Sequence, residues 1–193
     1  MGRRRVLSAV LTCLAVAAVS DAQDERFPNT KSLGRAAVEY RDDTIHLVAA
    51  YYYSQRSHDS LWLLIEAAVS TEERMSMSRA AFRLIAPDGE EMVLAEQAEF
   101  ARDSNRTRPL LQNARTTRHP VASYIRRRNF TEPLRFFTVS FGPVVQDEFV
   151  VDKNRVVHGD LFFIAPTGLW EDGTYSLIVE QNGVRAAVPI ILE

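Results

Sequence analysis

Apolar and polar residues alternate with a period of two along much of this chain, which is the pattern of β-strands with one buried face. Residues 44–53 follow it, with Ile45 and Leu47 on one face and His46 on the other. The alternation is clearest in residues 174–181 and 184–192. These segments predict strands that each bury one side against a core.

Turn residues separate several of these segments. Asn182-Gly183 is the strongest two-residue hairpin signal in the chain and suits a type I′ turn. Pro87-Asp88-Gly89 predicts a second hairpin, because proline presets φ for a turn and glycine accepts a positive φ. Pro189 lacks an N–H donor, so residues 184–192 are expected to form an edge or bulged strand.

Residues 61–69 are almost continuously apolar and predict a central strand covered on both faces, although a helix of this length remains possible. Shorter strands are expected at 134–141, 148–151, 156–157 and 161–164. About eight or nine short strands with turns at this spacing favour an all-β, antiparallel β-sandwich.

Two regions lack strand periodicity. Residues 23–43 are polar, and we expect a flexible lead-in with a turn of helix near 35–40. Residues 96–130 predict a helical or irregular insertion, with Pro109 opening a helix that Pro120 ends. Residues 44–193 then form a single domain that contains this insertion.

The sequence Asp172-Gly173-Thr174-Tyr175-Ser176-Leu177 resembles the Gly-x-Tyr-x-Leu stretch of immunoglobulin-like and fibronectin-type sandwiches. The resemblance covers about twenty residues. It implies an immunoglobulin-like architecture in which the Tyr175 hydroxyl bonds back to nearby backbone, as in a tyrosine corner. The Cys–Trp–Cys signature of antibody domains is absent.

Residues 1–22 have the layout of a secretory signal peptide. Three arginines at 3–5 precede an apolar run at 6–19, and Ser20-Asp21-Ala22 supplies small residues for cleavage. We therefore expect a periplasmic or secreted protein with no stable membrane insertion after cleavage. Two alternative readings are a lipobox at Leu11-Thr12-Cys13 and a twin-arginine signal at the same arginines.

Composition narrows the chemistry of the exported part. Cys13 is the only cysteine, so residues 23–193 hold no disulfide, thiolate nucleophile or cysteine metal site, which suits a bacterial envelope. This part carries 20 Lys and Arg (23 − 3) against 24 Asp and Glu (25 − 1), which does not suggest nucleic acid. The sequence contains no Gly-x-Ser-x-Gly motif and no glycine-rich phosphate loop. We expect no cofactor.

The insertion carries the strongest binding signal. Nine arginines lie between 102 and 135, against two acidic residues. Guanidinium groups match carboxylate and phosphate geometry, so the expected partner is a protein or an anionic envelope component. Alternatively, the arginines pair with acids of the same domain or face solvent. The candidate binding residues are Arg118, Tyr124, Arg126, Arg127 and Arg128.

Two further short motifs contain side chains that could bind a metal or transfer a proton. His158-Gly159-Asp160 offers metal or acid–base groups, or forms an exposed turn. Met75-Ser76-Met77 offers thioether ligands for copper, or lies in a loop with half-buried side chains. Taken together, the sequence predicts an exported, non-catalytic binding or assembly module of the bacterial envelope. The alternative is a hydrolase of an envelope polymer or glycan that uses His158 and Asp160.

Overall fold

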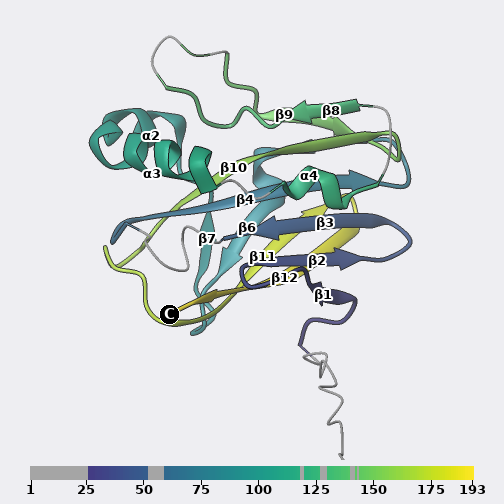
Figure 1. Ribbon diagram of the computed structural model, residues 1–193, viewed down its shortest axis with the longest axis horizontal. Coiled ribbons are helices and arrows are strands. Elements are labelled where there is room, and N and C mark those ends of the chain that lie inside the picture. The colour runs from purple at the N-terminus through teal and green to yellow at the C-terminus, as the bar shows by residue number, and fades with distance from the viewer. Residues whose placement is uncertain (1–25, 52–58, 118–119, 127–129, 140–141, 143) are drawn as a thin grey trace, which may run out of the picture.

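The computed structural model describes residues 26–51, 59–117, 120–126, 130–139, 142 and 144–193 (Figure 1). The expected signal peptide therefore lies outside the described residues. The chain is mostly β and forms several sheets, so the all-β prediction is confirmed. Among the described residues, no helix is long and apolar enough to cross a membrane.

The larger sheet has six strands, and the two longest, of ten residues each, lie side by side within it. Five of its strands pair antiparallel, but the edge strand β8 runs parallel to β10, so the expectation of a purely antiparallel sandwich is wrong at this edge. In spatial order the strands are β1 (Thr30–Ser32), β2 (Ala37–Arg41), β3 (Ile45–Ala50), β4 (Trp62–Thr71), β10 (Arg155–Ile164) and β8 (Phe130–Pro133).

A four-stranded antiparallel sheet packs against the larger one. Asn182 and Gly183 both have positive φ, 51° and 81°, which confirms the type I′ turn between its last two strands. Pro189 lies in the edge strand, as expected. The strands are, in spatial order, β12 (Val184–Leu192), β11 (Gly173–Gln181), β6 (Phe82–Ile85) and β7 (Glu91–Val93). The turn at residues 87–89 joins β6 to β7, which confirms the second hairpin.

The main core lies between these sheets and is built from alternate residues of their strands. Odd-numbered residues of β4 and β10, such as Ile65 and Leu161, meet Leu177 and its neighbours from the four-stranded sheet. Burying this apolar surface is the main driving force for folding. The largest fully buried side chains of this core include Phe82, Phe136, Phe163, Leu63 and Leu84.

Arg79 joins the segment before β6 to the segment that follows β8. It lies in the 3₁₀ helix η1 (Arg79–Ala81), and its guanidinium stacks on Phe137, with 4.7 Å between Cζ and the ring centroid. It also donates hydrogen bonds to the carbonyl oxygens of Phe136 and Ala95. These contacts fix the segment after β8 over the core.

The structure corrects four local expectations. Residues 30–32 and 37–41 are paired strands rather than a flexible lead-in with a helical turn, because Val38 and its neighbours bury their apolar faces. Residues 75–78 form β5, which pairs with β9 (Glu148–Val151) instead of lying in a loop. Residues 134–139 form no strand, and β8 precedes them. The two short strands expected at 156–164 are one strand.

The turn between β2 and β3 is fixed by Asp42. Its carboxylate accepts hydrogen bonds from the backbone N–H groups of Thr44 and Ile45, and from the hydroxyls of Thr44 and Tyr40. Burial, the largest single influence, raises the pKa of Asp42, but these hydrogen bonds together outweigh it and lower the pKa below its ordinary value of 3.8.

The insertion is helical, as predicted, and covers the outer face of the larger sheet (Figure 1). It forms α2 (Gln97–Arg102), α3 (Ser104–Thr117) and α4 (Val121–Tyr124). Pro109 lies inside α3 and does not open it, because the helix already begins at Ser104, where the N–H groups of Arg106 and Thr107 bond to Asp103. This cover contributes to the burial of β4, since α2 and α3 pack on Trp62 and Leu64 and α4 packs on Ala68.

Candidate functional site

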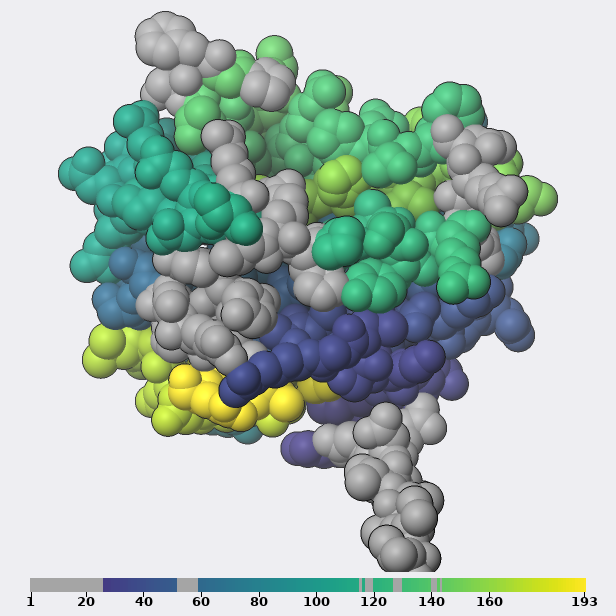
Figure 2. Space-filling model, viewed as in Figure 1, coloured from purple at the N-terminus to yellow at the C-terminus, as the bar shows by residue number. Residues whose placement is uncertain are grey.

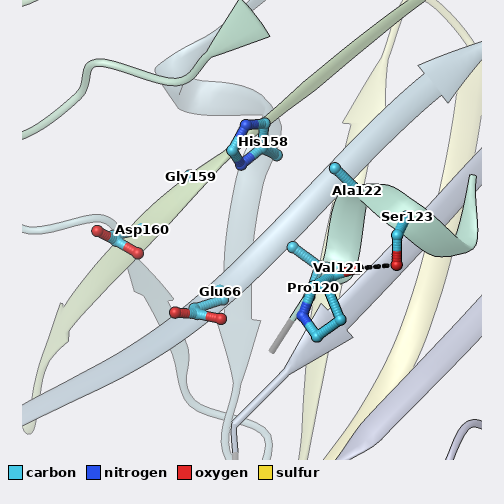
Figure 3. A pocket seen from close by; sticks show the side chains of 8 residues that line it. All are labelled: Glu66, Pro120, Val121, Ala122, Ser123, His158, Gly159 and Asp160. Atoms are coloured by element: carbon cyan, nitrogen blue, oxygen red, sulfur yellow. Dashed lines mark hydrogen bonds between the residues drawn. The ribbon is translucent and has the colours of Figure 1, made fainter. Parts of the chain in front are cut away.

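A pocket of about 380 Å³ opens on the outer face of the larger sheet, between two groups of helices. Figure 2 shows both groups on this face, α2 and α3 in teal and α4 in green. We call this cavity the outer-face pocket. Its wall consists of Glu66, Pro120, Val121, Ala122, Ser123, His158, Gly159 and Asp160 (Figure 3).

The polar wall comes from β4 and β10. Glu66 on β4 lies directly opposite Asp160 on β10, and His158 lies two residues from Asp160. Side chains two apart share a face, so all three project outward, away from the main core. Glu66 is only 7% exposed, whereas His158 and Asp160 are partly exposed. Each of the three already takes part in an interaction within the protein.

The opposite wall is α4, which is held down by apolar contacts. Val121 and Ile125, four residues apart, pack on Val48, Ala68 and Val156 of the sheet. Ser123 donates a hydrogen bond from Oγ to the carbonyl oxygen of Pro120, at 2.7 Å (Figure 3). Val121, Ala122 and Ser123 of α4 therefore line the pocket while the helix stays packed on the sheet.

The helices α2 and α3 rest on the sheet beyond the pocket. Phe100 packs with Trp62 and Phe162, with ring centroids 6.3 Å and 4.9 Å away. The Trp62 indole donates a hydrogen bond to Asp103 Oδ2 at 2.6 Å, which ties the start of α3 to β4. The pocket therefore lies between two apolar contacts, at a stretch of the outer face where β4 and β10 carry two acids and a histidine.

Gly159 lets the chain after β8 pass close to β10. A Cβ at this position would lie 2.6 Å from Leu134 Cβ and 2.9 Å from its carbonyl oxygen. The Leu134 N–H donates to the His158 carbonyl oxygen at 2.6 Å. His158-Gly159-Asp160 is thus the middle of a long strand, and the expectation of an exposed turn is wrong. Glycine is required here by close packing and not by a turn.

Two neighbouring carboxyl groups and an imidazole give the pocket a defined chemistry. Carboxylates accept hydrogen bonds and attract cations, and a histidine near a carboxylate can hold or move a proton. Among the described residues, no three His, Cys, Asp or Glu side chains are grouped as a metal site requires. The fitting ligand group is a hydrogen-bond donor or a cation.

None of the predicted binding residues lines this pocket: two follow or belong to α4, and three lie outside the described part of the chain. Arg126 is exposed just after α4, and Tyr124 is half-buried against the apolar contact under that helix. Arg118, Arg127 and Arg128 lie outside the described residues. The structure brings the insertion together with His158 and Asp160, which the sequence analysis treated as separate candidates.

Glu66 is the pocket residue that sequence reasoning missed. The available signal was a single acid within the apolar run at 61–69, since a charge in a strand buried on both faces needs a specific reason.

The structure does not support a copper site at Met75-Ser76-Met77. Met77 is fully buried in the main core and Met75 packs against it, so their sulfur atoms serve packing.

Comparison of the chain with protein families, with curated proteins and with solved structures gives no match. The function is therefore inferred from the geometry of the pocket.

Proposed function

We propose that this protein is an exported, non-catalytic binding module of the bacterial envelope, located in the periplasm or secreted, and that its ligand enters the outer-face pocket. The observation that carries this proposal is the pocket itself. It combines an apolar wall from α4 with a polar wall of Glu66, His158 and Asp160. A mostly apolar cavity with a few converging polar groups is the usual form of a ligand site.

The polar wall decides which part of a ligand can enter. Glu66 is buried and Asp160 lies opposite it, so a negative group would be repelled from the interior. We infer that an ammonium, guanidinium or neutral donor group enters, while its apolar portion contacts Val121 and Ala122.

A second contact outside the pocket suits an anionic group. Arg126 is exposed immediately after α4, in the arginine-rich part of the insertion. A partner that carries both charges, such as a peptide with acidic and basic groups, satisfies both surfaces. This refines the expected anionic partner, because in this proposal its negative charge contacts Arg126 and stays outside the pocket. Complementary charges of this kind mainly accelerate association and improve specificity.

Within this proposal the scaffold is an immunoglobulin-like sandwich. Tyr175 supports it, because its hydroxyl donates to the Glu171 carbonyl oxygen at 3.0 Å and accepts from the Glu171 N–H at 3.2 Å. A tyrosine bonded to backbone a few residues upstream is the tyrosine corner of such domains.

The experiment is capture of solubilised envelope components by the protein and by two matched variants. Ala122→Phe fills the pocket from α4, whereas Ala98→Phe places the same ring on an exposed position of α2. We expect capture by the wild type and by Ala98→Phe, and loss of capture by folded Ala122→Phe. Equal capture by all three proteins would contradict the pocket as the binding site.

A hydrolase is the second candidate, and the pairing of Glu66 with Asp160 favours it. Directly opposite residues on antiparallel strands have Cβ atoms about 5 Å apart. Retaining glycosidases also use a pair of neighbouring carboxyl groups, and Glu66 and Asp160 supply such a pair.

The Asp160→Asn variant distinguishes the two functions. If the pocket only binds, captured polymer is recovered intact from both proteins. If the wild type releases soluble fragments over time and Asp160→Asn retains capture without release, the protein is a hydrolase.

A further inference from the structure

A second pocket lies at one end of the sandwich and shares no lining residue with the outer-face pocket. It is formed between the β6–β7 turn and the segment that joins β10 to β11. We call it the end pocket. Its volume is about 50 Å³, enough for a small polar group but not for a whole sugar or nucleotide.

Trp170, which lines this pocket, carries an unsatisfied donor. The side chain is 9% exposed and packs edge-on against Tyr175, with ring centroids 5.6 Å apart. Its indole Nε1 is buried and has no hydrogen-bond acceptor among the described residues. The indole N–H of Trp62, in contrast, has an acceptor, because it donates a hydrogen bond to Asp103. A buried N–H without an acceptor costs free energy, and a ligand oxygen that reaches it would recover that cost.

The mouth of the pocket is negatively charged. Asp88, Glu90 and Glu171 line it and are exposed, and no described Lys, Arg or His is part of the lining. Two of these charges also act on Tyr175. Burial is the largest cause that raises the pKa of this tyrosine, and the negative charges of Glu171 and Asp88 raise it further. The lining of the end pocket therefore combines a buried donor with exposed carboxylates.

The walls are fixed by close contacts. Gly173 has φ of 151°, and a Cβ there would lie 2.7 Å from Pro87 Cγ, so the turn packs directly on the start of β11. Tyr175 bonds to both backbone groups of Glu171, which holds the residue after Trp170 in place. A preorganised site of this kind loses little entropy on binding.

We propose that the end pocket binds a protonated amine that carries a nearby hydroxyl or carbonyl oxygen, as in amino alcohols and amino sugars. The oxygen enters the pocket and accepts from the Trp170 indole N–H. The ammonium group remains at the mouth, beside Glu171 and the acids of the turn. This site is independent of the outer-face pocket and of the function proposed for it.

The test follows the indole N–H signals of the two tryptophans by NMR, with Trp62→Phe used to assign them. Four probes separate the features of the ligand: glucosamine and ethanolamine have both groups, N-acetylglucosamine lacks the charge, and cyclohexylamine lacks the oxygen. We expect a saturable shift of the Trp170 signal with glucosamine or ethanolamine, and none with the other two.

The two active probes also identify the source of the ligand chemistry. A response to glucosamine alone indicates amino sugars, and a response to both indicates amino alcohols in general. Glu171→Gln should weaken binding about two- to fivefold, as expected for an exposed charge pair, while Glu148→Gln on the remote strand β9 should not. The absence of a saturable shift with either probe, or an equal shift with N-acetylglucosamine, would overturn the proposal.

Discussion

Replacing Gly159 with alanine tests whether close packing across β10 holds the polar wall of the outer-face pocket. The new Cβ would lie 2.6 Å from Leu134 Cβ and 2.9 Å from its carbonyl oxygen. Carbon atoms in contact normally lie about 3.5–4 Å apart. The chain at Leu134 must therefore move away from β10, and the hydrogen bond from its N–H to His158 must lengthen.

The magnitude follows from three contributions. Overpacking of this kind costs about 1–3 kcal/mol, and the weakened hydrogen bond adds about 1 kcal/mol. Alanine recovers about 0.5–1 kcal/mol, because it restricts the unfolded chain more than glycine does. We expect a net loss of about 2 kcal/mol in the free energy of unfolding, or about 6 °C in Tm for a protein of this size.

Urea denaturation followed by circular dichroism measures this change, and Leu134→Gly supplies the control. Removal of the Leu134 side chain relieves the contact between the two Cβ atoms, so Gly159→Ala should cost less in that background. A Gly159→Ala protein as stable as the wild type, or the same cost in both backgrounds, would refute the packing argument.

Three other substitutions test separate parts of the fold. Tyr175→Phe removes both hydrogen bonds to Glu171 and should lower the free energy of unfolding by about 1–3 kcal/mol in urea denaturation; an unchanged value would contradict a structural role for this corner. Pro109→Ala should raise the Tm of the protein, because it restores a helical N–H in the interior of α3; a lower Tm would show that proline is favourable there. Asp42→Asn should lose stability at neutral pH, and its deficit against the wild type should shrink on acidification. The lowered pKa of Asp42 gives stabilisation that is complete above 3.8 and is lost as the pH falls through the folded-state pKa; a deficit independent of pH would contradict that origin.

Features that depend on neighbouring residues were predictable from the sequence. Asn182-Gly183 specifies its turn through the backbone freedom of two residues, and the apolar run at 61–69 indicates burial on both faces. The helical character of the insertion was also predictable, since the period of two stops at residue 96.

Features that depend on distant parts of the chain were not predictable. The parallel pairing of β8 with β10 joins residues such as Phe130 and Arg155, and no local pattern encodes it. The glycine in His158-Gly159-Asp160 suggests a turn until Leu134 is known to pass beside it. The outer-face pocket depends on three separate segments, so the sequence indicated its residues individually but not their assembly.

The most direct test of the outer-face pocket is the affinity of Ala122→Phe for the captured envelope component, measured by calorimetry beside Ala98→Phe. If the ligand enters between α4 and the acids of β4 and β10, the first variant binds at least about tenfold more weakly, which corresponds to about 1.4 kcal/mol. The second variant should then bind as the wild type does. Equal affinities of the two folded variants would contradict the assignment of ligand binding to this pocket.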